Sequence, residues 1–404
     1  MTTRLIRNWI PLLRWGLLLL PIPAIVIAQT QANDPAERAR TMSAQSERNG
    51  LAEPFRGLST DGTITPGLFP IRSTGVSTGP VRQAASAFLA SLSDAQRKKT
   101  MFAVDDPEWR KWMNQHFYIR QGVGFNEMSD AQRAAAITLM RASLSAKGLQ
   151  LSRDAMRLNE TLAELTNNHV EYGEGLYWLT VMGTPSATEP WGWQLDGHHL
   201  IVNFFVLGDQ VVMSPSFWGG EPVIARDGRY RGTAILQDVQ DAGLAFVNSL
   251  DEGQRKQAII EAAKPGNNNL TEAFRDNADI KRTGIAASAL SPAQRARLQS
   301  LIGLYVGNMR DGHAAVKMRE VQQHIGATTF SWVGGIAPDS VFYYRIHSPV
   351  ILIEFDHQRP VAIGNRGGPP TRDHVHVVVR TPNGNDYGTD LLRQHLARHP
   401  HPKS

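Results

Sequence analysis

Hydrophobic and polar positions alternate in two separate regions of the chain, and each region follows a stretch with apolar residues at helical spacing. Alternation predicts strands, whereas apolar residues at every third and fourth position predict amphipathic helices. The strand segments are rich in β-branched and aromatic residues and are bounded by Gly, Pro and Asp. The predicted strands are 176–182, 193–207, 210–214, 341–347, 350–357 and 374–380. Helices followed by antiparallel strands favour an α+β fold.

Four similar segments predict where helices begin. They are SLSDAQRKK (91–99), MSDAQRAAA (128–136), SLDEGQRKQ (249–257) and LSPAQRARL (290–298). Each has a Ser or Asp followed three residues later by Gln, which is the pattern of a capping box. The first side chain accepts a free backbone N–H of the first turn, and the Gln reaches back. We therefore expect helices directly after Ser93, Ser129, Asp251 and Ser291.

The four segments form two pairs, which indicates an internal duplication. The corresponding glutamines are 158 and 162 residues apart, and the apolar stretches that precede the first pair also match. This period is too long for a solenoid repeat. The sequence thus predicts two α+β repeat units, 81–235 and 236–404, packed as a pseudo-two-fold pair with a cleft between them. Each unit would contain helices followed by a small antiparallel sheet.

Residues 1–28 have the features of a secretory signal. Arginines precede an apolar run at 15–28, and Val26 and Ala28 occupy the −3 and −1 positions of a cleavage site. The run is shorter than the roughly 20 apolar residues of a membrane span. We predict cleavage, a periplasmic or secreted protein, and no stable membrane insertion afterwards; an uncleaved anchor is the alternative. Residues 29–80 are expected to form an extended leader with one short helix around 35–48.

Composition narrows the function classes. Of the 404 residues, 42% are hydrophobic and 20% are charged, as in ordinary globular proteins. The absence of cysteine excludes disulfides, thiolate metal sites and a cysteine nucleophile. The net charge of +5 comes largely from arginines in the N-terminal segment, so nucleic-acid binding has no support. A small molecule is the expected partner, and the oligomeric state stays open.

Polar residues gather on the predicted strands of the second unit. Glu354 and Asp356 share one strand face, and His374 and His376 share a face of a later strand. If the two strands are neighbours, two imidazoles and two carboxylates converge. That ligand set suits a divalent Zn, Fe or Mn ion. The alternative is that the histidines are ordinary strand residues that face water or bond to Asp356.

The first unit carries a second polar feature, EPWGWQLDGHHL (189–200). His198 or His199 could complete the metal site from the other unit, but consecutive strand residues face opposite ways, so at most one points into it. The alternative is a hairpin with solvent-facing histidines. Trp191 and Trp193 are candidate substrate-binding residues, with core packing as their alternative.

Two further candidates lie near the end of the second unit. Arg380 could bind an anionic substrate, although an exposed arginine is the ordinary expectation. Asp386, in the turn TPNGNDYG (381–388), is a candidate metal ligand or an acceptor that orients a histidine. The alternative is that these turn residues serve the backbone alone.

A metal site of this kind favours hydrolysis, with bound water as the nucleophile and Glu354 or Asp356 as the general base. An iron or copper oxidase would use the same types of ligand. The second hypothesis is a non-catalytic exported binding protein that holds a small ligand or a metal in its cleft. The sequence contains no G-x-S-x-G elbow, P-loop, H-E-x-x-H or dinucleotide fingerprint.

Taken together, five segments resemble domain-of-unknown-function family 3500, a family of exported proteins. They are PWGWQLDGHHL (190–200), SPSFWGGEP (214–222), IEFDHQ (353–358), DHVHVVVRTPNGNDYG (373–388) and DLLRQHL (390–396). The family pattern pairs Gly-His-His with a later His-x-His, Asn-Asp and aromatic-Gly. The residues that the resemblance singles out are His198, His199, His374, His376, Asn385 and Asp386. The resemblance implies membership of the family and no activity.

Overall fold

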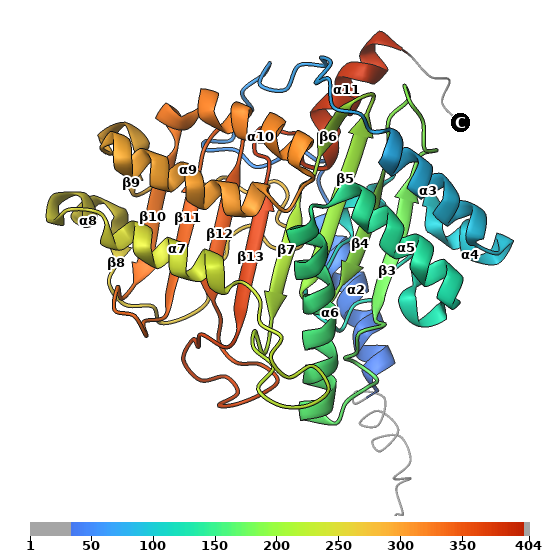
Figure 1. Ribbon diagram of the computed structural model, residues 1–404, viewed down its shortest axis with the longest axis horizontal. Coiled ribbons are helices and arrows are strands. Elements are labelled where there is room, and N and C mark those ends of the chain that lie inside the picture. The colour runs from blue at the N-terminus through green and yellow to red at the C-terminus, as the bar shows by residue number, and fades with distance from the viewer. Residues whose placement is uncertain (1–33, 400–404) are drawn as a thin grey trace, which may run out of the picture.

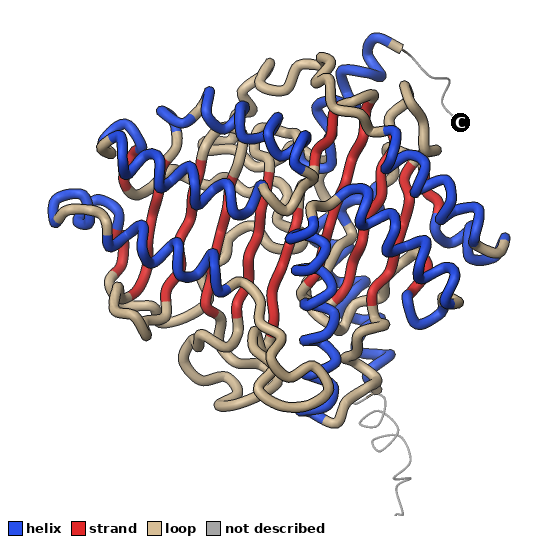
Figure 2. Tube along the Cα trace, viewed as in Figure 1, coloured by secondary structure: helices blue, strands red, loops and turns tan. Residues whose placement is uncertain are grey.

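The protein is built around one mixed β-sheet of thirteen strands that runs through both halves of the chain (Figure 1). The structure is a computed structural model and describes residues 34–399. The predicted signal at 1–28 therefore lies outside the described residues. Helices form a layer against the sheet, as Figure 2 shows by colour. The α+β class expected from the sequence agrees with this mixture of helices and strands.

The first half contributes β1 (Met101–Phe102), β2 (Val123–Gly124), β3 (Tyr177–Met182), β4 (Trp191–Gly197), β5 (Leu200–Leu207), β6 (Gln210–Val212) and β7 (Ser216–Gly220). The second half contributes β8 (Ile259–Glu261), β9 (Ile285–Ala286), β10 (Thr329–Gly334), β11 (Phe342–His347), β12 (Leu352–His357) and β13 (Val375–Arg380). The order across the sheet is β1-β3-β4-β5-β7-β13-β12-β11-β10-β8. Of the other three strands, β2 pairs with β3, β6 with β5 and β9 with β10.

The α-helices of the described residues are α2 (Pro35–Gly50), α3 (Gly79–Ser91), α4 (Asp94–Thr100), α5 (Asp130–Ser143), α6 (Ala146–Thr166), α7 (Gln237–Asn248), α8 (Glu252–Ala258), α9 (Pro292–Val306), α10 (Asp311–Gln323) and α11 (Thr389–Arg398). Helix α2 confirms the short helix expected around 35–48. In Figure 1, α5 and α6 lie in front of the first half of the sheet, and α7 and α9 in front of the second. Within residues 34–399, no helix combines the length and apolar character of a membrane span.

All four predicted helix starts are confirmed. In each case the capping side chain accepts the backbone N–H of the Gln three residues on, and that Gln accepts the N–H of the capping residue. The capping residues are Ser93, Ser129, Asp251 and Ser291. The glutamines also join neighbouring helix starts. Gln132 Nε2 donates to Gln96 Oε1 at 2.8 Å, and Gln294 Nε2 donates to Gln254 Oε1 at 2.7 Å.

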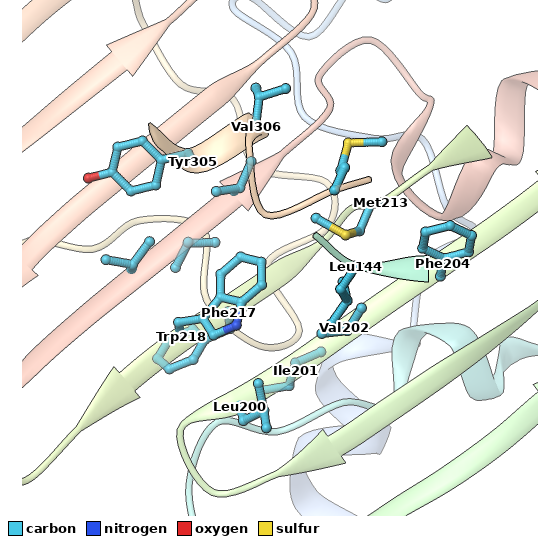
Figure 3. Packing of buried hydrophobic residues seen from close by; sticks show 14 of the residues in the cluster. Leu144, Leu200, Ile201, Val202, Phe204, Met213, Phe217, Trp218, Tyr305 and Val306 are labelled. Atoms are coloured by element: carbon cyan, nitrogen blue, oxygen red, sulfur yellow. The ribbon is translucent and has the colours of Figure 1, made fainter. Parts of the chain in front are cut away.

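The sheet face beneath the helices is apolar and forms the core. On β4, Trp193 donates its indole N–H to Ser143 of α5 at 3.2 Å, and on β11 Tyr344 bonds to a carbonyl of α7 at 2.9 Å. Figure 3 shows buried residues near the junction of the two halves, where Trp218 of β7 faces the helix layer and donates to Ser152 of α6 at 3.4 Å, whereas Phe217 lies on the opposite face against the ring of His376. Burial of these large side chains stabilises the helix layer on the sheet.

Two long loops cover the opposite face of the sheet. One is 103–122, between β1 and β2, and the other is 262–284, between β8 and β9. Gln194 of β4 donates to a carbonyl of the first loop at 3.0 Å, and Glu354 of β12 accepts a backbone N–H of the second at 3.0 Å. This face is therefore polar, and it is where the candidate site forms.

The sheet differs from the sequence prediction in three places. The segment 193–207 is a hairpin of two strands, and the longer strands β7 and β10 and the short strands β1, β2, β8 and β9 were not among the predicted ones. Instead of two small sheets facing a cleft, the halves share one sheet, because β7 and β13 pair antiparallel at its centre. The remaining predicted strands are confirmed to within two residues. The internal duplication and the pseudo-two-fold arrangement stay predictions.

Candidate metal centre

Three histidine side chains meet where the two halves of the sheet join. His374 directly precedes β13, His376 lies on that strand, and His199 lies in the turn between β4 and β5. Nε2 of His376 is 3.1 Å from Nε2 of His374 and 3.2 Å from Nε2 of His199. All three side chains are buried, and their ligand atoms lie within 4.8 Å of one another. This group could therefore hold one metal ion.

The hairpin geometry fixes His199. Strands β4 and β5 leave only His198 and His199 for the turn, and His199 has a φ of +61°. That left-handed conformation is uncommon for a residue other than glycine. Its N–H donates to the carbonyl of Asn114 at 3.1 Å, and its own carbonyl accepts the N–H of Gly219 at 2.8 Å. Strain that is held in place by surrounding bonds is frequent at functional sites.

The other ring nitrogen of each β13 histidine is already bonded to an acceptor. His374 Nδ1 is 2.7 Å from the carbonyl oxygen of Arg359, and His376 Nδ1 is 2.6 Å from Oε1 of Glu272. A carbonyl and a carboxylate accept but do not donate, so both Nδ1 atoms carry a proton. In the neutral rings, both Nε2 atoms then present lone pairs to each other. Metal-ligating histidines are oriented by outer acceptors in this way.

Burial favours the uncharged form of these rings. It lowers the pKa of His374 to about 3, with the nearby His376 adding to the effect. Burial also lowers the pKa of His199 well below its usual range, and the neighbouring histidines act in the same direction. Neutral imidazole is the form that ligates metals. The site is therefore ready to bind a cation at neutral pH without first losing protons from these two rings.

Glu272, on the loop 262–284, connects the site to both halves. Asn269 Nδ2 donates to its Oε1 at 2.8 Å, and Asn114 Nδ2 donates to its Oε2 at 3.2 Å. Burial opposes ionisation, but His376 and these amides outweigh it, so the pKa of Glu272 is lowered. Because Asn114 also accepts the N–H of His199, one loop residue fixes both the turn histidine and the carboxylate behind His376.

The two carboxylates predicted to join the site lie on the strand next to His376 and on the same face of the sheet, but they are not part of the histidine cluster. Glu354 is fully engaged elsewhere: it accepts the backbone N–H groups of Leu270 and Thr271, each at 3.0 Å, and the hydroxyl of Tyr343 at 2.7 Å. The sequence therefore placed the carboxylates on the correct face of a strand next to the histidines. The catalytic role predicted for Glu354 does not fit these contacts.

Asp356 is bound in a fully buried ion pair with Lys264, at 2.6 Å. It also accepts the backbone N–H of Asn268 at 2.6 Å. Burial raises the pKa of Asp356 to about 6, although Lys264 opposes this shift. The predicted catalytic and ligand roles of Asp356 do not fit these contacts. Instead, Asp356 and Glu354 together hold the backbone that carries Glu272.

Arg380 and Asp386 bind each other instead of a substrate or a metal. Arg380 is buried, its Nε lies 2.7 Å from Asp386, and its Nη2 lies 2.7 Å from Asp276. Asp276 also pairs with Arg110 at 2.8 Å. These contacts fasten β13 to the two loops on the polar face. The predicted substrate role of Arg380 and ligand role of Asp386 therefore do not fit.

Trp191 and Trp193 are buried completely. The indole N–H of Trp191 donates to the carbonyl of Ser186 at 3.1 Å. Both residues alternate with the polar positions of β4, so they face the helix layer and not the loops. The core-packing alternative agrees with this placement, and the substrate-binding interpretation does not.

His198 lies beside the cluster without joining it. Its ring stacks on that of His199, with 3.9 Å between centroids, and its Nδ1 lies 2.8 Å from Oδ1 of Asn159. The two histidines lie side by side because they form a turn, where the alternation of a strand does not apply. His199 is thus the one histidine of this pair in the cluster, and His198 supports it.

Sequence reasoning missed Glu272 and Asn114. Both lie in irregular loops, where no hydrophobic period indicates which way a side chain points. The only local signal for Glu272 is the asparagine run at 267–269, which predicts a turn. Neither residue could be connected with a histidine far away in the chain without knowledge of the strand order.

Comparison with family models matches residues 74–389 to a family described as Protein of unknown function (DUF3500). The match covers well over half of the chain and includes all three histidines of the cluster. No curated protein and no solved structure matches the chain.

Proposed function

The chain belongs to the DUF3500 family, and we propose that it is an exported metal-binding protein whose metal centre catalyses hydrolysis. The ligands would be the Nε2 atoms of His199, His374 and His376. One observation carries the proposal: two Nε2 atoms whose Nδ1 partners are fixed lie only 3.1 Å apart in a buried site. Two lone pairs at this distance repel each other unless a cation lies between them.

A proton is the competing cation, and burial disfavours it on the ring of His374. A shared proton would leave a positive charge on the ring of His374 or His376. Burial lowers the pKa of His374 to about 3, so that ring resists protonation near neutral pH. A metal ion would accept all three lone pairs at once, including that of His199. A metal ion is therefore the cation that all three rings could share.

The ligand set favours zinc among the divalent ions expected from the sequence. With Glu354 and Asp356 held elsewhere, three imidazoles remain. Imidazole suits Zn, Fe and Cu, whereas Mn prefers carboxylate and carbonyl oxygens. Catalytic zinc sites typically use three protein ligands and keep a fourth position open.

Zinc bound in this way supplies an activated water and a Lewis acid, which is the chemistry of hydrolysis. Glu272 would orient the ring of His376 and increase its basicity. The buried setting would limit access of bulk water and strengthen electrostatic interactions at the site. Because Glu354 and Asp356 hold the loop, neither is proposed any longer as the general base.

Two further parts of the proposal rest on the sequence. Export rests on the predicted signal at 1–28. The duplication is supported by the paired capping boxes and by the two ends of the sheet, where β1 pairs parallel with β3 and β8 pairs parallel with β10. A gene-fusion origin from two α+β units would explain why one site draws ligands from both halves.

The test is the metal content of the exported protein, purified without an affinity tag. We expect close to one equivalent of metal, and its loss in a folded His374→Ala/His376→Ala variant. The matched control is His399→Ala/His401→Ala, because the histidines near the C-terminus could collect metal unspecifically. Absence of metal from all three proteins, even after reconstitution with Zn, Fe and Cu, would overturn the proposal.

The hydrolase is distinguished from the binding protein by turnover. The zinc-loaded protein should cleave at least one member of a panel of esters, phosphoesters and amides, and His199→Asn should abolish cleavage. Asn is chosen because it tolerates the left-handed backbone at this position. One equivalent of tightly bound metal with no turnover on any substrate class would favour the alternative, a protein that carries a metal or small ligand.

A further inference from the structure

A pocket of about 350 Å³ lies close to the candidate metal centre. Its lining comes from four parts of the chain: helix α2, the loop 103–122, the end of α6 with the loop that follows it, and the Gly- and Pro-rich segment that follows β12. The volume falls within the range of small-molecule sites. The residues that matter for the argument are Arg38, His116, Phe117, Glu171, Tyr172 and Arg366.

The aromatic lining of the pocket packs directly behind the cluster. His116 and Tyr172 lie 4.8 Å apart between ring centroids, and each lies 5.4 Å from the ring of His198. His198 in turn stacks on His199 at 3.9 Å. One ring therefore separates the lining of the pocket from a proposed metal ligand.

A second connection runs through Glu221. Its carboxylate accepts the backbone N–H groups of Val361 and Ala362, at 2.8 and 3.0 Å, and both of these residues line the pocket. The same carboxylate lies 3.7 Å from Nδ1 of His374. The pocket is thus connected to the cluster on two sides, through a turn histidine and through a β13 histidine.

The charge of the pocket is one unit positive. Arg38 is paired with Glu171, which also accepts from Asn168 at 2.7 Å. Within residues 34–399, Arg366 has no carboxylate at ion-pair distance, and its Nε donates to the carbonyl of Val361 at 2.9 Å. Its remaining guanidinium N–H groups are suited to a carboxylate. The aromatic rings beside it suit a flat, apolar body.

We propose that this pocket binds a small aromatic carboxylate beside the metal centre. Arg366 would bind the carboxylate, and Phe117, His116 and Tyr172 would contact the ring. The inference rests on the proposed function, because it makes the pocket the substrate site of that centre. It names the substrate class that the metal site alone leaves open.

The probes are benzoate and its neutral analogue benzamide, each titrated into the full chain by calorimetry. Benzoate should bind at least tenfold more tightly than benzamide, and Arg366→Gln should remove that preference. Arg319→Gln, at an exposed position of α10, is the matched control and should leave it unchanged. Equal binding of the two probes, or benzoate binding that survives Arg366→Gln, would overturn the inference.

Proximity to the metal is tested separately with cobalt in place of zinc. Benzoate bound in the pocket should show enhanced nuclear relaxation with the cobalt-loaded protein and not with the zinc-loaded one. No enhancement, despite Arg366-dependent binding, would refute the role as substrate site. Metal content is measured on the same samples, so failure of the metal centre is seen independently of failure of the pocket. Far-UV circular dichroism would show whether each variant is folded.

Discussion

His374 and His376 face each other through their Nε2 atoms, 3.1 Å apart, while the Nδ1 atom of each is bonded to an acceptor. His376 lies on β13 and His374 directly precedes the strand, so the strand period alone brings the two rings to one face. What the strand does not determine is their tautomer, which is set by the Arg359 carbonyl and the Glu272 carboxylate.

Glu272 should control metal affinity without binding the metal. Glu272→Gln keeps an acceptor for His376 Nδ1 but removes the charge, whereas Glu272→Ala removes both. We expect zinc affinity to fall in that order, by roughly 10- to 100-fold for the alanine variant. Competition with a chromophoric chelator measures it. Affinities that are unchanged in both variants would show that Glu272 does not support the ligand.

Lys264 and Asp356 should matter for stability more than for the metal. Removing one partner of a buried ion pair leaves an uncompensated charge and typically costs about 3–5 kcal/mol. We therefore expect Lys264→Met to lower the free energy of unfolding of the metal-free protein strongly, and Lys264→Met/Asp356→Asn to restore part of it. Urea unfolding measures both.

The zinc affinity of an Asp356 variant tests whether Asp356 is a metal ligand. If Asp356 only binds the loop 262–284, its substitution should lower zinc affinity no more than substitution of Glu272 does. If Asp356→Asn weakened zinc binding more than Glu272→Ala, with little change in stability, Asp356 would have to be returned to the ligand set.

Arg380 should act as a structural cross-link. Its removal leaves Asp386 buried without its ion-pair partner and Asp276 paired with Arg110 alone, so Arg380→Met should unfold the protein or reduce its stability by several kcal/mol, on the order of a broken buried pair. Asp386→Asn is the milder variant, because the amide can still bond to the backbone N–H of Thr381. Thermal unfolding compares them. A normally stable Arg380→Met protein that failed only to bind an anion would favour the substrate role.

His347 should make the protein less stable in acid. Burial, with Arg345 and Arg282 acting in the same direction, lowers its pKa to about 3. The unfolded chain binds this proton near pH 6.5 and the folded chain does not. Stability should therefore be complete above pH 6.5 and decline as the pH falls from there towards 3. One such group contributes a slope of up to about 1.4 kcal/mol per pH unit.

His347→Gln isolates this contribution, since glutamine does not titrate in that range. The free energy of unfolding of the variant should depend less steeply on pH between 6.5 and 4 than that of the parent, whatever the offset between the two curves. Urea unfolding at several pH values gives both slopes. Parallel curves would mean that His347 is protonated in the folded protein.

Much of the site could be predicted where a local rule applied. The two-residue period of a strand predicted that His374 and His376 share one face, and that Glu354 and Asp356 share a face of another strand. In the structure these two strands are neighbours. The capping boxes fixed the starts of four helices, because their hydrogen bonds involve residues only three positions apart.

The errors occurred where a partner came from elsewhere in the chain. The face of Glu354 and Asp356 was correct, but nothing local indicated that the loop 262–284 would supply Lys264 and backbone N–H groups to them. Trp193 fits a binding platform as well as a core position until the helix above it is known. Strand β7 was missed because its Gly- and Pro-bounded sequence has the character of a loop, and with it the single sheet was missed.

The most direct measurement of the central claim is X-ray absorption at the metal edge of the zinc-loaded full chain. We expect about three imidazole nitrogens at roughly 2.0–2.1 Å, with one further light ligand, and loss of the imidazole signal in His374→Ala/His376→Ala. A metal shell made of oxygens without imidazole, or an unchanged spectrum in the double variant, would contradict a metal centre formed by His199, His374 and His376.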